Sequence, residues 1–147
     1  MRKLLIILLI STSFVTSAAP NPCTVVGSSM EQTLFNSVMH DLNISADIIQ
    51  RNKTAVQIIN ISSVSEVFAK QLARIDYSAD KQRNVKALLP EEDYFESYYT
   101  NGTKNITAKY TYINHQGKRD AFIASNIINN DECSVRFNGY LTVSREF

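Results

Sequence analysis

The amino-acid sequence predicts an α+β domain, with N-terminal helices packed on a C-terminal three- to four-stranded antiparallel meander. Helical spacing of apolar residues dominates the first two thirds of the chain, and strand-like alternation dominates the last third. Helices followed by a run of strands are typical of α+β layering, in which one face of the sheet packs on a core. We expect a single domain over residues 29–147, because a chain of this length builds one modest core.

The first 18 residues are predicted to be a signal peptide. Arg2 and Lys3 precede an unbroken apolar run over residues 4–10, and the small residues that follow suit a cleavage site. The apolar run is shorter than the roughly 20 residues that a membrane-spanning helix needs. We therefore expect a secreted chain with no membrane span. An extended N-terminal arm over residues 19–28 is expected to follow, because it begins with two prolines.

Two capping-box patterns predict the first two helices. Ser29 and Gln32 precede apolar residues at a spacing of four, which predicts a helix over residues 30–43. Ser63 and Glu66 repeat the pattern before a second helix. The predicted apolar face of this second helix consists of Val64, Val67, Phe68, Leu72 and Ile75. The β-branched stretch over residues 54–61 is predicted to be a strand.

Proline and glycine predict where the next helices begin and end. A further helical stretch over residues 78–89 is expected to stop at Pro90, whose ring clashes with a continuing helix. A short helix then begins at Pro90, and the acidic residues 91–92 stabilise its N-terminus through the helix dipole. The Asn-Gly pair at residues 101–102 is expected to end this helix in a left-handed cap.

Three runs of alternating residues predict the meander. They span residues 106–112, 121–128 and 133–143, and short polar turns join them. Gly139 is predicted to mark a bulge in the last strand. Alternation in that strand predicts a core-facing set of Cys133, Val135, Phe137, Leu141 and Val143.

Helices followed by a curved antiparallel sheet resemble, in outline, the cystatin-like and NTF2-like folds. The cystatin inhibitory loop follows a Gln-x-Val-x-Gly pattern, whereas Gln57-Ile58-Ile59-Asn60-Ile61 lacks the Val and the Gly at the required places. An inhibitor of that mechanism is therefore not expected. The NTF2-like outline implies a small enzyme or a lipid carrier with a tyrosine-lined cone.

The two cysteines, Cys23 and Cys133, are predicted to form one disulfide. An even pair in an oxidising compartment pairs most simply with itself, and the chain has no Cys-x-x-Cys redox motif. The bond would join the N-terminal arm to the last strand. Closing a loop of this length stabilises the folded chain by roughly 4 to 5 kcal/mol in the chain-entropy description.

Five Asn-x-Ser/Thr triplets predict N-linked glycosylation. Random placement of 13 Asn and 25 Ser plus Thr residues would give about 2 such triplets. An asparagine that carries a glycan must face water. We expect the glycans to cover one side of the domain and to leave the C-terminal sheet bare for a partner, around Arg136, Asn138 and Tyr140. The five predicted acceptors are Asn43, Asn52, Asn60, Asn101 and Asn105.

A group of tyrosines is the best candidate for a binding surface. Tyrosine has an apolar ring and a polar hydroxyl, and both interfaces and ligand pockets favour that combination. The alternative is core packing with the hydroxyls at the boundary. The candidate set, expected between the short helix and the sheet, is Tyr94, Tyr98, Tyr99, Tyr110, Tyr112 and Tyr140.

Composition argues against several other classes of protein. Without the first 18 residues the chain has 13 basic and 14 acidic side chains, so no electrostatic reason exists to bind nucleic acid. No metal-ligand cluster, phosphate-binding loop or nucleophile motif is present, and we expect no cofactor. His40 and His115 are interpreted as solvated residues. An enzyme is therefore the less favoured interpretation.

The short leader, the Ala-Pro-Asn-Pro-Cys stretch at residues 19–23, the crowded triplets and the single cysteine pair resemble small secreted nematode proteins of uncharacterised families. This resemblance covers overall layout and transfers no functional residue. We expect a secreted, N-glycosylated small domain with a non-catalytic extracellular binding or structural role, and with a protein or small ligand as its partner. The alternatives are a bacterial periplasmic binding, immunity or inhibitor protein, in which the triplets are accidental, and a small NTF2-like enzyme or lipid carrier.

Overall fold

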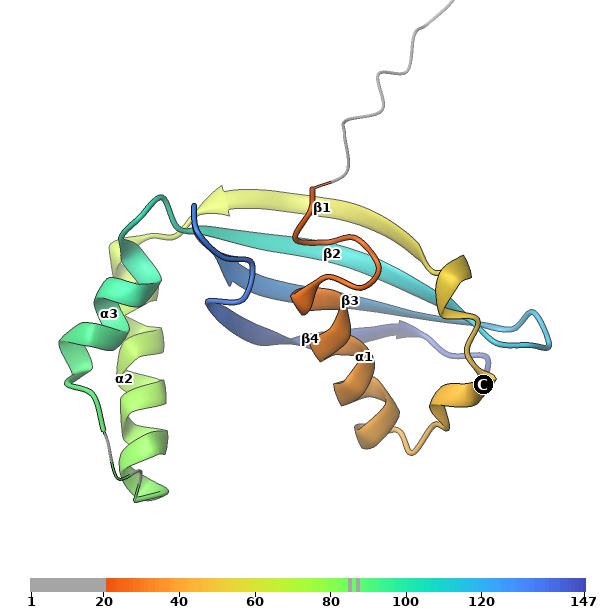
Figure 1. Cartoon of the computed structure of the whole chain (residues 1–147), viewed down its shortest axis with the longest axis horizontal. Coiled ribbons are helices and arrows are strands. Elements are labelled where there is room, and N and C mark those ends of the chain that lie inside the picture. Colours follow the sequence, from red (N-terminus) through yellow and green to blue (C-terminus); the bar gives the residue numbers. More distant parts are fainter. Residues whose placement is uncertain (1–20, 85, 87) are drawn as a thin grey trace, which may run out of the picture.

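The computed structural model describes residues 21–84, 86 and 88–147 of the chain. The predicted signal peptide, residues 1–18, and the first two residues of the predicted arm lie outside the described residues. The fold class is confirmed: within the described residues, three α-helices accompany a four-stranded antiparallel meander with the strand order β1-β2-β3-β4 (Figure 1). In chain order the elements are α1 (Ser29–Asp41), the one-turn 3₁₀ helices η1 (Ala46–Ile48) and η2 (Arg51–Lys53), β1 (Ala55–Ser63), α2 (Glu66–Gln82), α3 (Glu91–Tyr99), β2 (Lys104–Ile113), β3 (Arg119–Ile128) and β4 (Arg136–Ser144).

The N-terminal arm is turned, not extended. Within residues 21–28, the amide of Thr24 donates to the carbonyl of Asn21 at 3.0 Å, and the amide of Ser28 donates to the carbonyl of Val25 at 2.9 Å. The expectation of an extended arm is therefore wrong over this stretch. A proline fixes its own φ and restrains the residue before it, but it leaves the residues that follow free to turn.

Helix α1 covers one face of the sheet, and the main core lies between the two (Figure 1). Alternate residues of β2 point toward α1, as the sequence pattern predicted, and these are Ile106, Ala108, Tyr110 and Tyr112. The buried side chains of α1 that pack on them are Met30, Leu34, Phe35 and Val38. We call this side of the sheet the α1 face. The opposite side is the open face, and β2 contributes Asn105, Thr107, Lys109 and Thr111 to it.

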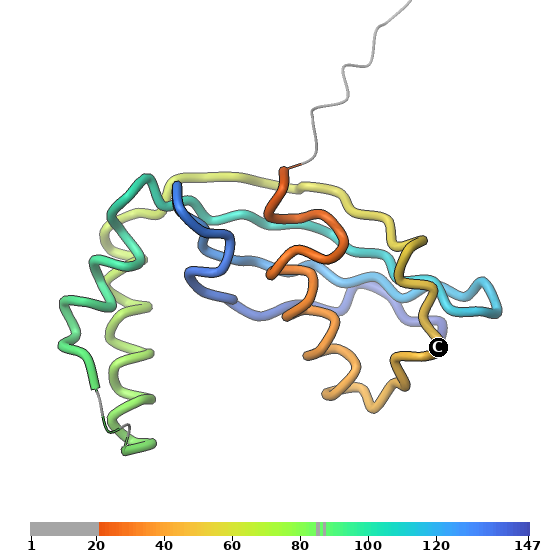
Figure 2. The backbone as a smooth tube through the Cα atoms, in the orientation of Figure 1, coloured from red at the N-terminus to blue at the C-terminus, as the bar shows by residue number. Residues whose placement is uncertain are grey.

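Helices α2 and α3 form a hairpin at one end of the sheet, apart from α1, as Figure 2 shows along the chain. Their small second core contains Ala69, Leu72 and Ala73 from α2, together with Tyr98 from α3. Two successive residues of β3 belong to different cores: Ile128 to the main core and Ile127 to the hairpin core. Side chains of a strand alternate between faces, so the hairpin packs on the end of the open face.

The predicted apolar face of α2 is only partly right. The buried stripe of this helix is formed by Ala69, Leu72 and Ala73, at the spacing of three and four that one helical face requires. Val67 and Ile75 lie outside this stripe and are 68% and 57% exposed. Large apolar residues alone indicated the wrong face, because the close packing of α2 in the hairpin core uses small alanines.

The boundaries of the helices differ from the predicted ones by small shifts. The cap of α1 is Ser28, one residue before the predicted Ser29, and the cap of α2 is Ser65, because β1 continues through Ser63. Helix α2 runs on to Gln82 without a break, so the separate helix expected over residues 78–89 is not found among the described residues of that stretch. Helix α3 and strand β1 lie where the sequence placed them.

An irregularity in β4 changes which of its residues face the core. Ser125 pairs with Gly139 while Asn126 pairs with Phe137, which leaves one extra residue in β4, and the φ of Gly139 is +98°. The predicted bulge is therefore confirmed. A one-residue bulge reverses the alternation beyond it, so Tyr140 joins Phe137 on the α1 face. The prediction that Leu141 and Val143 face the core is wrong, and these side chains are 70% and 50% exposed.

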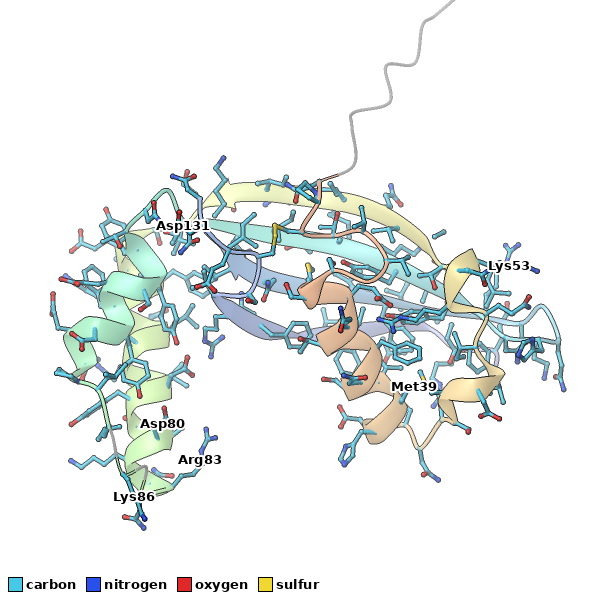
Figure 3. The ribbon with its side chains drawn as sticks, viewed as in Figure 1. Met39, Lys53, Asp80, Arg83, Lys86 and Asp131 are labelled. Carbon is cyan, nitrogen blue, oxygen red and sulfur yellow. A yellow bond between two sulfur atoms is a disulfide. The ribbon has the colours of Figure 1, made fainter. Side chains whose placement is uncertain are left out.

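The disulfide between Cys23 and Cys133 is confirmed (Figure 3). It joins the turned N-terminal arm to the loop before β4, and its two cysteines are separated by 110 residues. The sequence had suggested that Cys133 lies in the last strand, but it lies in this loop. The bond therefore anchors the segment that leads into α1 beside the end of the sheet.

We predict that replacing both cysteines by serine lowers the free energy of unfolding by about 4 to 5 kcal/mol, because the unfolded chain loses its longest covalent constraint. Urea denaturation of the variant and of the native protein measures the difference, and reduction of the native protein by a thiol provides the matched control. A loss below about 1 kcal/mol would mean that the bond adds little to the noncovalent contacts of the arm.

Candidate functional site

The predicted glycan acceptors lie at the surface, but not on one side of the molecule. Asn43 and Asn52 are exposed near the end of α1 and in η2, and Asn101 is exposed in the turn after α3. Asn60 pairs with Thr107 across the sheet, so its side chain lies on the open face. Asn105 is half-buried on the same face. The open face of the sheet therefore carries two predicted acceptors and is not the bare surface that the sequence suggested.

The six candidate tyrosines form two separate groups. Tyr110, Tyr112 and Tyr140 lie on the α1 face, where the first two are 0% and 1% exposed. Tyr94, Tyr98 and Tyr99 lie on α3. The structure does not bring the six together around one pocket.

Each tyrosine of the first group has a defined partner for its hydroxyl. Tyr110 donates to the carbonyl of Thr24 at 2.9 Å, and Tyr140 donates to Asp41 at 3.0 Å. Tyr112 donates to the Glu31 carboxylate at 3.3 Å. Burial raises the pKa of Tyr112, and the nearby Glu31 raises it further, so this phenol remains a hydrogen-bond donor at physiological pH. These side chains fill the space under α1, which an NTF2-like enzyme or lipid carrier would keep open.

A buried ion pair lies beside these tyrosines, and the sequence gave no sign of it. Glu31 is 0% exposed. Its carboxylate accepts hydrogen bonds from Arg51, at 3.0 Å from Nε and 2.5 Å from Nη2. The amide of Gly27 donates to the same carboxylate at 2.8 Å. The Arg51 guanidinium also lies 4.6 Å from the centre of the Phe35 ring. The cation and these donors compensate the burial of the carboxylate, so its role is structural.

The hairpin is joined to the sheet by a second ion pair. Arg136, at the start of β4, contacts the Asp76 carboxylate of α2 at 2.5 Å from Nε and 2.9 Å from Nη2. The hydroxyl of Tyr98 donates to the same carboxylate at 2.8 Å. The hydrogen bonds from Arg136 hold the pKa of Asp76 below its usual value. This contact fixes the hairpin on the open face.

The outer surface of the hairpin carries a groove between α2 and α3. Its volume is about 360 Å³, and it is lined by Lys70, Ala73, Arg74, Glu91, Glu92 and Phe95. The Phe95 ring stacks on Tyr99 with a centroid distance of 5.3 Å. The Lys70 ammonium lies 5.6 Å from the centre of the Phe95 ring. The groove thus offers an aromatic wall beside charges of both signs. Of its lining residues, Phe95 and Arg74 are of the types enriched at protein interfaces.

The two histidines lie in different parts of the fold. His40 is exposed and contacts Asp41 at 3.0 Å, whereas His115 lies in the β2–β3 turn beside the carbonyl of Asp47. No cluster of three or more His, Cys, Asp or Glu side chains suited to a metal ion is found among residues 21–84, 86 and 88–147. Within the same residues, no helix has the length and apolar character needed to cross a membrane.

Comparison with models of protein families, with curated proteins and with solved structures finds no match. The resemblances to secreted nematode proteins and to the cystatin-like and NTF2-like outlines therefore stay predictions. Any functional conclusion must come from the surface of this chain itself.

The ion pair of Glu31 and Arg51 predicts an asymmetric response to substitution. Arg51→Met keeps packing on Phe35 but leaves the Glu31 carboxylate buried without its cation, and we expect a loss of about 3 to 5 kcal/mol in the free energy of unfolding. Glu31→Gln leaves an arginine whose side chain is 37% exposed and can turn to water, so its loss is smaller. Chemical denaturation of both single variants and of the double variant measures the three values. A double variant less stable than Arg51→Met would contradict the interpretation that the unpaired Glu31 carboxylate causes the larger loss.

Asp76 predicts an acid-dependent loss of stability. Because its pKa is lower in the folded than in the unfolded chain, the unfolded chain binds the proton first as pH falls below about 4. The stabilisation is therefore present at neutral pH and is lost as pH falls through the folded pKa. We expect Asp76→Asn to show a smaller drop in unfolding free energy between neutral and acid pH than the native protein, measured by urea titration at each pH. Equal drops would show that the Arg136 contact does not stabilise the anion.

Proposed function

We propose that this chain is a secreted, N-glycosylated domain with a non-catalytic extracellular binding role, and that the α2–α3 hairpin is its binding surface. The observation that carries the proposal is the distribution of glycan acceptors over the fold. All five lie on the sheet, on the segment between α1 and β1, or in the turn between α3 and β2, whereas residues 66–99 contain none. Glycans are bulky and solvated, so they favour a partner on the surface without them.

Exposed apolar residues on the hairpin support the same surface. Val67, Ile75 and Tyr99 are 68%, 57% and 41% exposed. The stacked pair of Phe95 and Tyr99 resembles the aromatic anchors that dominate many protein interfaces. Tyr99 and Phe95 also lie beside the groove, in contrast to Tyr94 and Tyr98, whose hydroxyls are held by Asp80 and Asp76. Figure 3 places Asp80, Arg83 and Lys86 toward the free end of the hairpin, away from the sheet.

The disulfide is consistent with an oxidising compartment, which the extracellular space and the bacterial periplasm share. Secretion through a glycosylating pathway is the part of the proposal that separates these two. Treatment with a glycosidase distinguishes them directly, because only a glycosylated chain loses mass. The test is best done on protein from its own source, since a foreign host would glycosylate accidental triplets as well.

The binding surface is tested by photo-crosslinking. A photoreactive amino acid replaces Val67 on the hairpin in the full chain, which is produced by a eukaryotic secretory host and exposed to extracellular fluid from the source tissue. We expect a discrete adduct, because this position borders the proposed surface. The matched control places the same amino acid at Lys109, on the open face of the sheet.

An adduct from position 109 alone, or the same set of adducts from both positions, would move the binding surface off the hairpin. Protein from its own source that shows no mass loss on glycosidase treatment would remove the argument from glycan distribution. Both measurements use the disulfide-bonded chain, whose fold is checked by its unfolding free energy.

A further inference from the structure

Strand β1 is one edge of the sheet. In the part of the chain that the structure describes, β1 pairs with β2 on one side and has no strand on the other (Figure 1). An edge strand presents a row of backbone amide and carbonyl groups that another strand can pair with. Each residue from Ile59 to Ser63 is also exposed, whereas β2 buries every second residue. The second half of β1 is therefore accessible to a further strand.

The composition of β1 favours such pairing. The strand reads Ala-Val-Gln-Ile-Ile-Asn-Ile-Ser-Ser and contains no charged residue, no proline and no glycine. Uncharged segments rich in β-branched residues are the ones that add most readily to other strands. Ile59 and Ile61 are 51% and 41% exposed in it. A second copy of the chain presents the same strand, so the chain is prone to pair with itself.

Natural proteins protect edge strands with charged side chains, prolines and bulges. The other edge, β4, is interrupted by the bulge at Gly139 and is followed by the charged residues Arg145 and Glu146. Strand β1 has a bulge at Ile59 but no charge. Its exposed half instead contains the acceptor triplet of Asn60, at residues 60–62.

A glycan on Asn60 would stand in the way of an added strand. Asn60 is exposed and pairs with Thr107, so its side chain rises from the open face. A strand added to β1 would lie about 4.8 Å away in the plane of the sheet. The residue opposite Asn60 would then hold its Cβ atom about 5 Å from that of Asn60, on the same face. A branched glycan is far larger than a side chain and occupies that space.

Self-pairing of β1 would double this obstruction. Two identical strands that pair antiparallel are related by a two-fold axis perpendicular to the sheet, and such an axis leaves both open faces on the same side. The two Asn60 glycans would therefore project from one face of the joined sheets. Without glycans, the same pairing would use the single β1 edge of each copy and would stop at two chains.

We propose that a glycan on Asn60 prevents the β1 edge from pairing with the β1 edge of a second copy. In the attachment, C1 of the sugar leaves a lipid-linked diphosphate donor and forms a C–N bond with Nδ2 of Asn60, which loses one proton, and the diphosphate departs. Asn60 thus differs in role from Asn52, which is exposed in η2 outside the sheet. The inference rests on the proposed function only for the entry of the chain into a glycosylating pathway.

The test compares full chains from a eukaryotic secretory host. Ser62→Ala removes the hydroxyl of the triplet, so Asn60 remains but is no longer an acceptor. Mass spectrometry of glycopeptides gives the occupancy of each acceptor, and sedimentation equilibrium gives the number of chains per particle. We expect Ser62→Ala to shift from one chain toward two as its concentration rises. The native chain and the matched control Ser62→Thr, which keeps the acceptor, should remain single, as should Asn52→Gln.

A second substitution locates the contact. Ile59→Lys adds a charge to the edge at a side chain that is 51% exposed, so the fold tolerates it. Two such lysines would lie close together in a self-paired β1, and like charges across paired strands oppose pairing. We expect Ile59→Lys to return the Ser62→Ala chain to single particles. Amides of β1 in Ser62→Ala should exchange with deuterium more slowly at high than at low concentration, whereas those of β4 should not change.

Three outcomes would overturn the inference. The first is a Ser62→Ala chain that stays single, and the second is self-association that persists after Ile59→Lys. In both, the proposed function is unaffected, because the native chain is still glycosylated. The third is an unoccupied Asn60 in protein from its own source. The proposed function fails with it only when the other four acceptors are unoccupied as well. Urea denaturation of each variant checks that its fold is retained.

Discussion

The buried carboxylate of Glu31 is the constraint on which the main core depends. Helix α1 buries the Glu31 side chain together with Leu34 and Val38. Burial of an uncompensated charge would oppose folding. The cation comes from Arg51 in η2, and further donors come from Gly27 before α1 and from Tyr112 of β2. Helix α1, η2 and β2, which are far apart in the sequence, therefore meet at this one carboxylate. The disulfide of Cys23 acts on the same region, because it holds the turn that leads into α1 beside the sheet.

The second constraint is the placement of the hairpin on the opposite face of the sheet. Asp76 and Arg136 fix it there, and Ile127 supplies the apolar contact from β3. Helix α1 and the hairpin therefore pack on opposite faces of one sheet. This arrangement leaves the hairpin as a projecting surface that contains none of the predicted glycan acceptors. The proposed binding surface thus depends on this ion pair.

Much of the fold was predictable because it depends on local pattern. The alternation over Ile106 to Tyr112 sets the buried face of β2, and the bulge at Gly139 was expected from its glycine. The candidate site was harder to predict. Residues 141 and 143 were assigned to the wrong face because one extra residue at the bulge reverses everything beyond it. Likewise, the apolar pattern of α2 could not show that the hairpin core uses Ala69 and Ala73 in place of Val67 and Ile75.

The sequence by itself determined the α+β class, the order of most elements, the cysteine pair and the positions of the five predicted acceptors. These follow from residue type and spacing, which act over short range or, for two cysteines, leave one pairing. Only the tertiary structure decided that Glu31 meets Arg51, that the candidate tyrosines divide between the α1 face and the hairpin, and that Asn60 and Asn105 share the open face. Such facts depend on strand register and on which face each helix covers. Register and layering are set by packing over the whole chain, and no local pattern records them.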